Sequence, residues 1–320
     1  MDPLKKAAHT AISVCMGARQ DEKILIVSDT VCSKIGKALF DTALELGHEA
    51  LYVEMKPMRI NGEEPPALIA GLMKEFDVIL LPTLRSLTHT NARREASALG
   101  KRVATFPGIT EDIMIRGMSA DYEKICARTI KLAGILEAGK KVRVTTEKGT
   151  DISFSIEGRK AYASKGLFRE FGESGNLPTG EAFLAPMEGT SNGVFIVDGS
   201  FASVGLVDKD IRLEVKDGYV VKIEGGDKAK ALDDMLKSVG PDAYSIAEFG
   251  IGTNDTAKIS GVILEDEKVM GTIHIALGNN LSMGGSVNIP VHVDGVVKEP
   301  NVWIDDSLIM EKGKFVIDIG

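Results

Sequence analysis

The chain has 320 residues, of which 44% are hydrophobic and 26% charged, and its net charge is −8. This length favours two domains, and an acidic chain without a Lys/Arg cluster is not expected to bind nucleic acid. No apolar run is long enough to span a membrane, the N-terminal residues do not form a signal peptide, and the three cysteines are widely separated without a CxxC pair. We therefore expect a cytoplasmic protein with no membrane partner.

The N-terminal part, residues 1–138, alternates helical and strand-like segments. Buried strands are predicted over residues 23–29, 48–55, 77–83 and 101–108, and helices over 4–18, 33–46, 65–76, 86–100 and 121–136. This alternation predicts an α/β domain with a mostly parallel sheet. The first strand–helix turn contains neither GxGxxG nor a P-loop, so a nucleotide site is not predicted.

The remainder, residues 139–320, is rich in β-structure. Strand segments with Asp-Gly or Lys-Gly turns occur at 141–158, 194–207, 211–225 and 301–318, and one amphipathic helix is predicted from Asp227 to Gly240. The predicted fold class is therefore α/β, with a mostly parallel N-terminal α/β domain followed by a β-rich α+β domain that binds metal.

Two histidines lie inside apolar, β-branched segments. The alternation of a strand places His274 on one face with Thr272 and Ala276, and places His292 beside Asp294. Imidazole and carboxylate together suit Zn, Fe, Co or Mn. A histidine on an apolar strand is also often an ordinary core residue, so this pattern alone leaves both interpretations open.

Two glutamates have similar surroundings. Glu181 opens the segment EAFLAP after a Gly/Pro turn, on a face with Phe183, and could simply be exposed. Glu248 lies inside the apolar segment SIAEFGIG, on the face predicted for Ile246 and Gly250. Because a glutamate in such a strand is seldom buried without a partner, Glu248 favours a metal site.

Together the segments at 176–186, 247–254, 266–278 and 292–294 resemble the thermophilic-type metallo-aminopeptidases, the aminopeptidase T family (peptidase family M29). The resemblance implies an aminopeptidase, a hydrolase of peptides, with two divalent ions (Zn, Co or Mn) and a homodimeric assembly. The implied metal ligands are Glu181, Glu248, His274, His292 and Asp294, and the implied catalytic carboxylate beside the metals is Glu267.

Such a metal pair would activate a bridging water, and Glu267 would carry its proton to the leaving amine. One departure stands out. Members of this family carry a tyrosine shortly after the residue that corresponds to His274, whereas this chain has GNNLSMGG there.

Two alternatives remain. Ring-cleaving dioxygenases similar to 2,5-dihydroxypyridine dioxygenase share this fold, and His274, His292 and Asp294 could form their mononuclear Fe(II) site with a small-molecule substrate. A non-catalytic protein that binds metal or peptide is the other alternative, but a structural zinc site needs only four ligands and this chain offers more.

Overall fold

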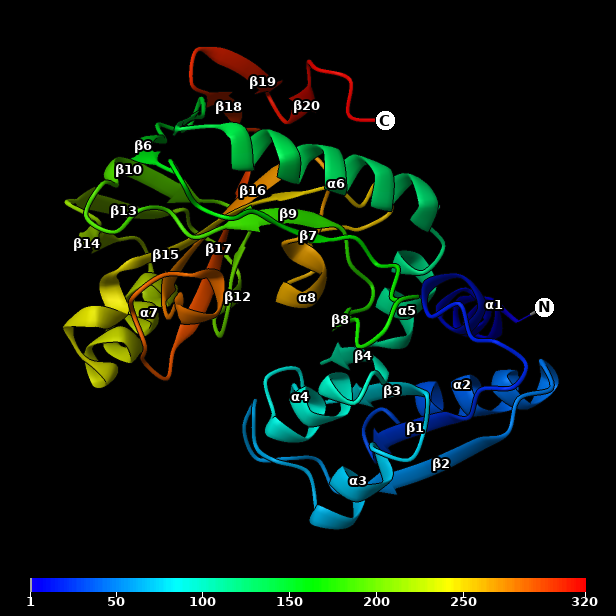
Figure 1. Ribbon diagram of the computed structural model, residues 1–320. Helices are drawn as coiled ribbons and strands as arrows, with labels where there is room; N and C mark the ends of the chain where they lie inside the picture. Colours follow the sequence, from blue (N-terminus) through cyan, green and yellow to red (C-terminus); the bar gives the residue numbers. More distant parts are fainter. Residues whose placement is uncertain (1) are drawn as a thin grey trace. The chain divides into compact units, whose positions relative to one another are not determined.

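The computed structural model describes residues 2–320 as two compact units (Figure 1). One unit comprises Met1–Glu123 and Gly166–Thr179, and the other comprises Lys124–Lys165 and Gly180–Gly320. The predicted division at residues 138 and 139 gives two continuous segments, whereas both units here are discontinuous. The chain returns to the first unit after residue 165 to add one more strand to its sheet.

The first unit contains a five-stranded parallel sheet in the order β2-β1-β3-β4-β8. Its strands are β1 (Ile24–Asp29), β2 (Ala50–Met55), β3 (Val78–Thr83), β4 (Arg102–Pro107) and β8 (Ser174–Asn176). The apolar segments of β1 and β3 are wholly buried, as expected for central strands covered on both faces. The predicted parallel sheet is thus confirmed. The strand β8 was not predicted, because its three residues, SGN, have no strand-like pattern.

The first unit also contains α-helices, which alternate with the strands of this sheet along the chain. They are α1 (Pro3–His9), which continues as a π-helical turn (Thr10–Cys15), α2 (Ser33–Glu45), α3 (Ala67–Leu72), α4 (Asn91–Ala98) and α5 (Glu111–Gly117). The segment predicted as helical from residue 86 becomes helical only at Asn91, because the side chain of Thr90 accepts a hydrogen bond from the backbone N–H of Arg93 and caps the helix there. The helix α6 (Tyr122–Ala138) follows.

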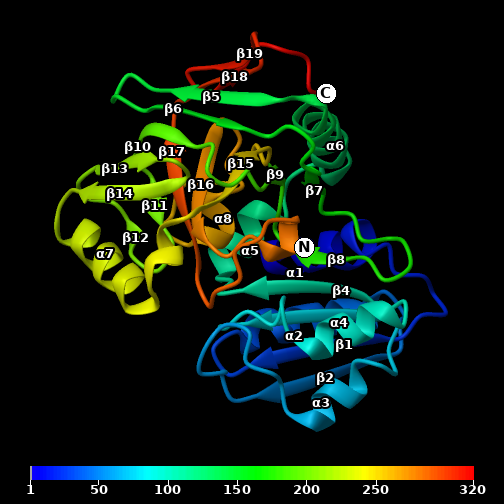
Figure 2. The same ribbon diagram turned by 60° about the vertical axis from the view of Figure 1, so that its left-hand side comes forward.

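The second unit contains two antiparallel sheets (Figure 2). The eight-stranded sheet has the order β14-β13-β10-β6-β5-β18-β19-β20, and the seven-stranded sheet has the order β12-β11-β17-β16-β15-β9-β7. The strands of the first are β5 (Lys141–Thr145), β6 (Asp151–Ser155), β10 (Asn192–Val197), β13 (Ile211–Lys216), β14 (Tyr219–Glu224), β18 (Asn301–Ile304), β19 (Ser307–Glu311) and β20 (Lys314–Phe315). Those of the second are β7 (Tyr162–Ser164), β9 (Glu181–Leu184), β11 (Ser200–Phe201), β12 (Gly205–Leu206), β15 (Ile246–Gly252), β16 (Thr272–Gly278) and β17 (His292–Lys298).

The two antiparallel sheets share one hydrophobic core. Phe154 of β6 and Phe249 of β15 meet edge to face, with 5.2 Å between ring centroids. The helix α7 (Asp227–Val239) adds Ala229, Leu232 and Leu236, as its predicted apolar face requires. One face of the seven-stranded sheet therefore supplies the core, and its opposite face is free for polar side chains.

Short helical segments complete this unit: α8 (Ile263–Asp266) and two 3-10 turns, Pro241–Tyr244 and Leu281–Met283. Within residues 2–320, no helix combines the length and the apolar composition needed to cross a membrane.

Candidate metal centre

Four neighbouring strands of the seven-stranded sheet carry five of the six predicted site residues. Glu181 is the first residue of β9, Glu248 lies in β15, His274 in β16, and His292 and Asp294 in β17. The residues that alternate with His274, namely Ile273, Ile275 and Leu277, belong to the hydrophobic core. The period of two thus places the apolar side chains in the core and His274 on the polar face, as predicted.

The residues opposite these side chains on the adjacent strands are small. In the antiparallel pairing, Gly252 stands opposite Glu181, Gly250 opposite His274, and Ala276 opposite both Glu248 and Asp294. Gly278 stands opposite His292. Because cross-strand partners lie on the same face of a sheet, this pattern leaves the space over the sheet to the imidazoles and carboxylates.

Glu248, His292 and Asp294 form one group whose ligand atoms lie within 4.8 Å of one another. Nε2 of His292 is 3.1 Å from a carboxylate oxygen of Glu248 and 3.5 Å from one of Asp294. Nδ1 of the same ring lies 2.7 Å from the backbone oxygen of Asn279, to which it donates. In that neutral tautomer, Nε2 keeps a lone pair, so this imidazole and the two nearby carboxylates could together hold a divalent cation.

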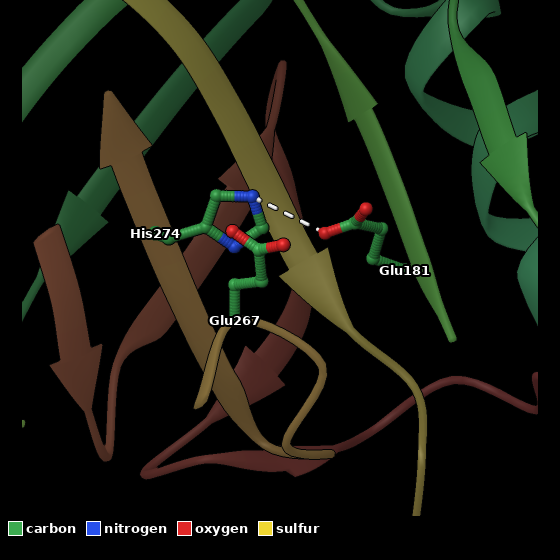
Figure 3. Close-up of side chains that lie close together, drawn as sticks. All are labelled: Glu181, Glu267 and His274. Carbon is green, nitrogen blue, oxygen red and sulfur yellow. Dashed lines mark ion pairs between the residues drawn. The ribbon is translucent and has the colours of Figure 1, made fainter. Parts of the chain in front are cut away.

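Glu181, Glu267 and His274 form a second group, shown in Figure 3. Nε2 of His274 is 3.5 Å from Oε2 of Glu181, and that oxygen is buried without a hydrogen-bond partner. The ammonium group of a lysine side chain already places a positive charge in this group. The ammonium of Lys268 donates to Oε1 of Glu181 at 2.6 Å and also to Oε1 of Glu267, and its side chain is only 2% exposed.

Glu248 connects the two groups. One of its oxygens lies 3.2 Å from Nε2 of His274, and the other lies 3.1 Å from Nε2 of His292. A β-bulge between Ile246 and Glu248 turns Ile246 into the hydrophobic core and leaves Glu248 on the polar face. The prediction that Ile246 shares the face of Glu248 is therefore wrong, because a strict period of two does not hold across a bulge.

The segment around α8 brings Glu267 and Lys268 over the sheet. The Asp266 carboxylate accepts hydrogen bonds from the backbone N–H groups of Ser260 and Gly261, at 2.6 and 2.8 Å. A side chain at Gly252 would place its Cβ 2.1 Å from the backbone oxygen of Val269, so this segment lies directly on β15. Glycine at this position therefore allows the close approach.

Burial and mutual charge shift the proton affinities of these side chains. For Glu248, burial is outweighed by hydrogen bonds from His274 and His292, and its pKa lies well below the ordinary value. Burial opposes protonation of His274, but its hydrogen bond to Glu248 and the charge of Glu181 raise its pKa to about 9. The pKa of Glu267 is raised to about 8 by burial and by the charges of Glu181 and Asp294, against the attraction of Lys268.

All six residues singled out in the sequence occur in the two groups, and their role as ligands or catalyst remains a prediction. The set of His274, His292 and Asp294, which was named for the dioxygenase alternative, is divided between the two groups, with His274 in one and His292 and Asp294 in the other. Sequence reasoning missed Lys268, for which no signal exists since lysines are rarely buried. It also missed the acceptor oxygen of Asn279, which only the fold can place.

Two adjacent groups of carboxylate and imidazole side chains could hold metal ions, an arrangement typical of metal-dependent enzymes. The sequence model of the 2,5-dihydroxypyridine 5,6-dioxygenase family matches residues 5–317, and the chain belongs to this family. A 2,5-dihydroxypyridine 5,6-dioxygenase of Pseudomonas putida is 23% identical over 220 residues. That match covers 64% of this chain and 62% of the relative's length.

Two solved structures have the same fold. The structure of 2,5-dihydroxypyridine dioxygenase from Pseudomonas putida superimposes with a TM-score of 0.84 at 18% identity, covering 98% of this chain and 97% of that one. Wild-type AmpT from Thermus thermophilus superimposes with a TM-score of 0.70 at 20% identity, covering 98% and 99%. The predicted fold class is confirmed, and the resemblance to the M29 aminopeptidases holds at the level of the fold.

The predicted function is wrong. Family membership indicates an oxygenase, not the aminopeptidase, hydrolase or metalloprotease expected from the sequence. The strand motifs that suggested a peptidase belong to a scaffold common to both kinds of enzyme, so they report the fold and not the reaction. The sequence contained one sign against a peptidase: the segment GNNLSMGG after His274 lacks the tyrosine that the aminopeptidases carry there.

Proposed function

We propose that this protein is an iron-dependent dioxygenase that opens the ring of a hydroxylated pyridine. The family match over residues 5–317 carries this proposal. The group of Glu248, His292 and Asp294 supports it, because one imidazole and two carboxylates can hold a divalent ion such as Fe(II), and three ligands leave coordination positions free. The side chain of His292 is 32% exposed, so this group can be reached from solvent.

The reaction follows from the name of the relative in Pseudomonas putida. Cleavage between ring carbons 5 and 6 breaks one carbon–carbon bond, and each carbon gains one atom of O₂. The hydroxylated carbon becomes a carboxyl group, and its former neighbour becomes a formyl group on the ring nitrogen. The ring loses four electrons and O₂ gains them, so the reaction needs no other reductant.

Within this proposal, Glu248, His292 and Asp294 hold the ion, and the backbone oxygen of Asn279 fixes the ring of His292. The bound iron supplies the one-electron chemistry that O₂ requires to react with a closed-shell ring. Glu267, whose carboxyl pKa is raised to about 8, lies beside His274, and as the pH rises toward 8 its ionised form can accept the hydroxyl proton of the substrate.

The decisive experiment measures oxygen uptake. Protein loaded anaerobically with Fe(II) should consume one O₂ for each 2,5-dihydroxypyridine whose ring absorbance is lost. Asp294→Asn should abolish both signals, whereas Glu214→Gln, an exposed carboxylate of β13, should leave both unchanged. Iron-loaded protein that consumes no oxygen with this compound would overturn the proposal for this substrate.

We also propose a small-molecule substrate, a cytoplasmic location and a homodimer. None of the three cysteines, which all lie within the described residues 2–320, forms a disulfide, and this supports a reducing compartment. Sedimentation equilibrium tests the assembly, and a monomer at micromolar concentration would contradict it.

A further inference from the structure

Lys268 is a cation built into one of the two groups. Its ammonium lies between Glu181 and Glu267 and donates to one oxygen of each, at 2.6 Å in the case of Glu181. The lysine side chain is 2% exposed, and those of Glu181 and Glu267 are 8% and 14% exposed. A buried ammonium with two carboxylate partners has two of its three donors engaged, and its charge is held in one position.

The other group has no such residue. Among the ion pairs of residues 2–320, Glu248 pairs with His274 and His292, and Asp294 pairs with His292. With neutral histidines, Glu248 and Asp294 bring a formal charge of −2 and no fixed cation. With both ionised, Glu181 and Glu267 bring the same charge, and Lys268 reduces their total to −1; with Glu267 protonated, Lys268 balances the charge of Glu181. The group of Glu248, His292 and Asp294 therefore carries more uncompensated negative charge, and should attract a metal ion from solution more strongly.

We propose that the ammonium of Lys268 occupies the place of a metal ion in the group of Glu181, Glu267 and His274, so that the chain binds a single ion, at Glu248, His292 and Asp294. An ion in the first group would have to share its carboxylates with Lys268. It would then stand close to a fixed positive charge in a poorly solvated region, where like charges repel strongly. Lys268 is thus a positioning residue that also sets the number of ions.

This inference rests on the metal site of the proposed function and is tested without measuring catalysis. The measurement is the number of Mn²⁺ ions bound per chain at saturation, by equilibrium dialysis with elemental analysis. We expect about one ion for the wild-type protein and about two for Lys268→Met, which keeps much of the side-chain volume and frees two carboxylates. Lys298→Met is the matched control, because Lys298 belongs to β17 and is 42% exposed, and it should still bind about one.

Electron paramagnetic resonance gives a second measurement. Mn²⁺ in the wild-type protein should have the spectrum of an isolated ion, and Lys268→Met should have that of a coupled pair. Two ions in the wild-type protein would overturn the inference, even if the variant fails to fold. A folded Lys268→Met protein that binds one ion with unchanged affinity would overturn it too.

The outcomes separate this inference from the proposed function. One ion per chain without oxygen uptake would overturn the function and leave the role of Lys268 intact. Oxygen uptake by a protein with two ions would overturn the role of Lys268 and leave the function intact.

Discussion

The imidazole of His274 occupies the space that a side chain at Gly250 would fill. The two residues are cross-strand partners on β16 and β15, and a Cβ at Gly250 would lie 2.1 Å from Nε2 of His274. No real Cβ comes so close, so glycine at this position is what allows His274 to reach both Glu181 and Glu248.

Gly250→Ala should therefore displace His274 and disturb Glu248. We expect a loss of about 1–3 kcal/mol in the free energy of unfolding, because a methyl group is forced into a packed site. Metal affinity should fall roughly 10- to 100-fold, as is usual when a partner of a ligand moves. Denaturant unfolding and metal titration check both effects. In the control, Gly134→Ala, the new methyl group meets nothing within 4 Å, and equal effects from the two variants would contradict the explanation.

His292→Ala should abolish the binding of the ion at Glu248 and Asp294. It removes the oriented nitrogen and leaves two carboxylates, one of which has no other ion-pair partner within residues 2–320. Elemental analysis after dialysis should find no retained ion. Hydrogen exchange should show that the first unit stays folded. His9→Ala, in α1, should keep the wild-type metal content. Full retention of metal by His292→Ala would refute the ligand role of His292.

The stability of the metal-free protein should decrease from pH 6.5 to pH 9. The pKa of His274 rises from an ordinary value near 6.5 to about 9 on folding, so its protonation stabilises the fold below pH 6.5, and this stabilisation is lost as the pH approaches 9. Glu267, with a pKa raised to about 8, acts in the same direction, because its ionisation is less favourable in the folded state.

Thermal midpoints across this pH range check the expectation, and the metal-loaded protein is the control. A bound ion replaces the proton as the positive partner of Glu248, so the decrease should be smaller when metal is present. A midpoint of the metal-free protein that rises toward pH 9 would contradict the proposed charge balance.

Cys32 should resist alkylation in the native protein. Burial, together with the charge of Asp29 and a hydrogen bond to it, raises the pKa of the Cys32 thiol to about 12, so almost no reactive thiolate exists at pH 8. Cys15 is buried as well, with a pKa raised well above the ordinary value, whereas Cys126 is partly exposed. Mass spectrometry after brief iodoacetamide treatment should find Cys126 modified first. Labelling of Cys32 at the rate of Cys126 would show that the fold opens readily at the turn between β1 and α2.

Local sequence signals predicted most of the elements. The apolar segments of β1 and β3, the periodic helix α7 and the alternating strands β16 and β17 all formed where their patterns indicated. The strand β8 and the helix α5 were missed, since β8 has three polar or small residues and α5 has seven residues. Such short segments take their structure from what they pack against and not from their own periodicity.

Strand alternation in the amino-acid sequence is sufficient to assign side chains to the polar face. Alternate residues of a strand share a face, so the order of residues alone places His274, His292 and Asp294 opposite the core. How these residues combine depends on the tertiary fold. The β-bulge beside Glu248, the antiparallel register and the segment after α8 determine that Glu248 links the two histidines and that Lys268 lies between Glu181 and Glu267. These relationships join residues far apart in the chain, and a local pattern contains no information about them.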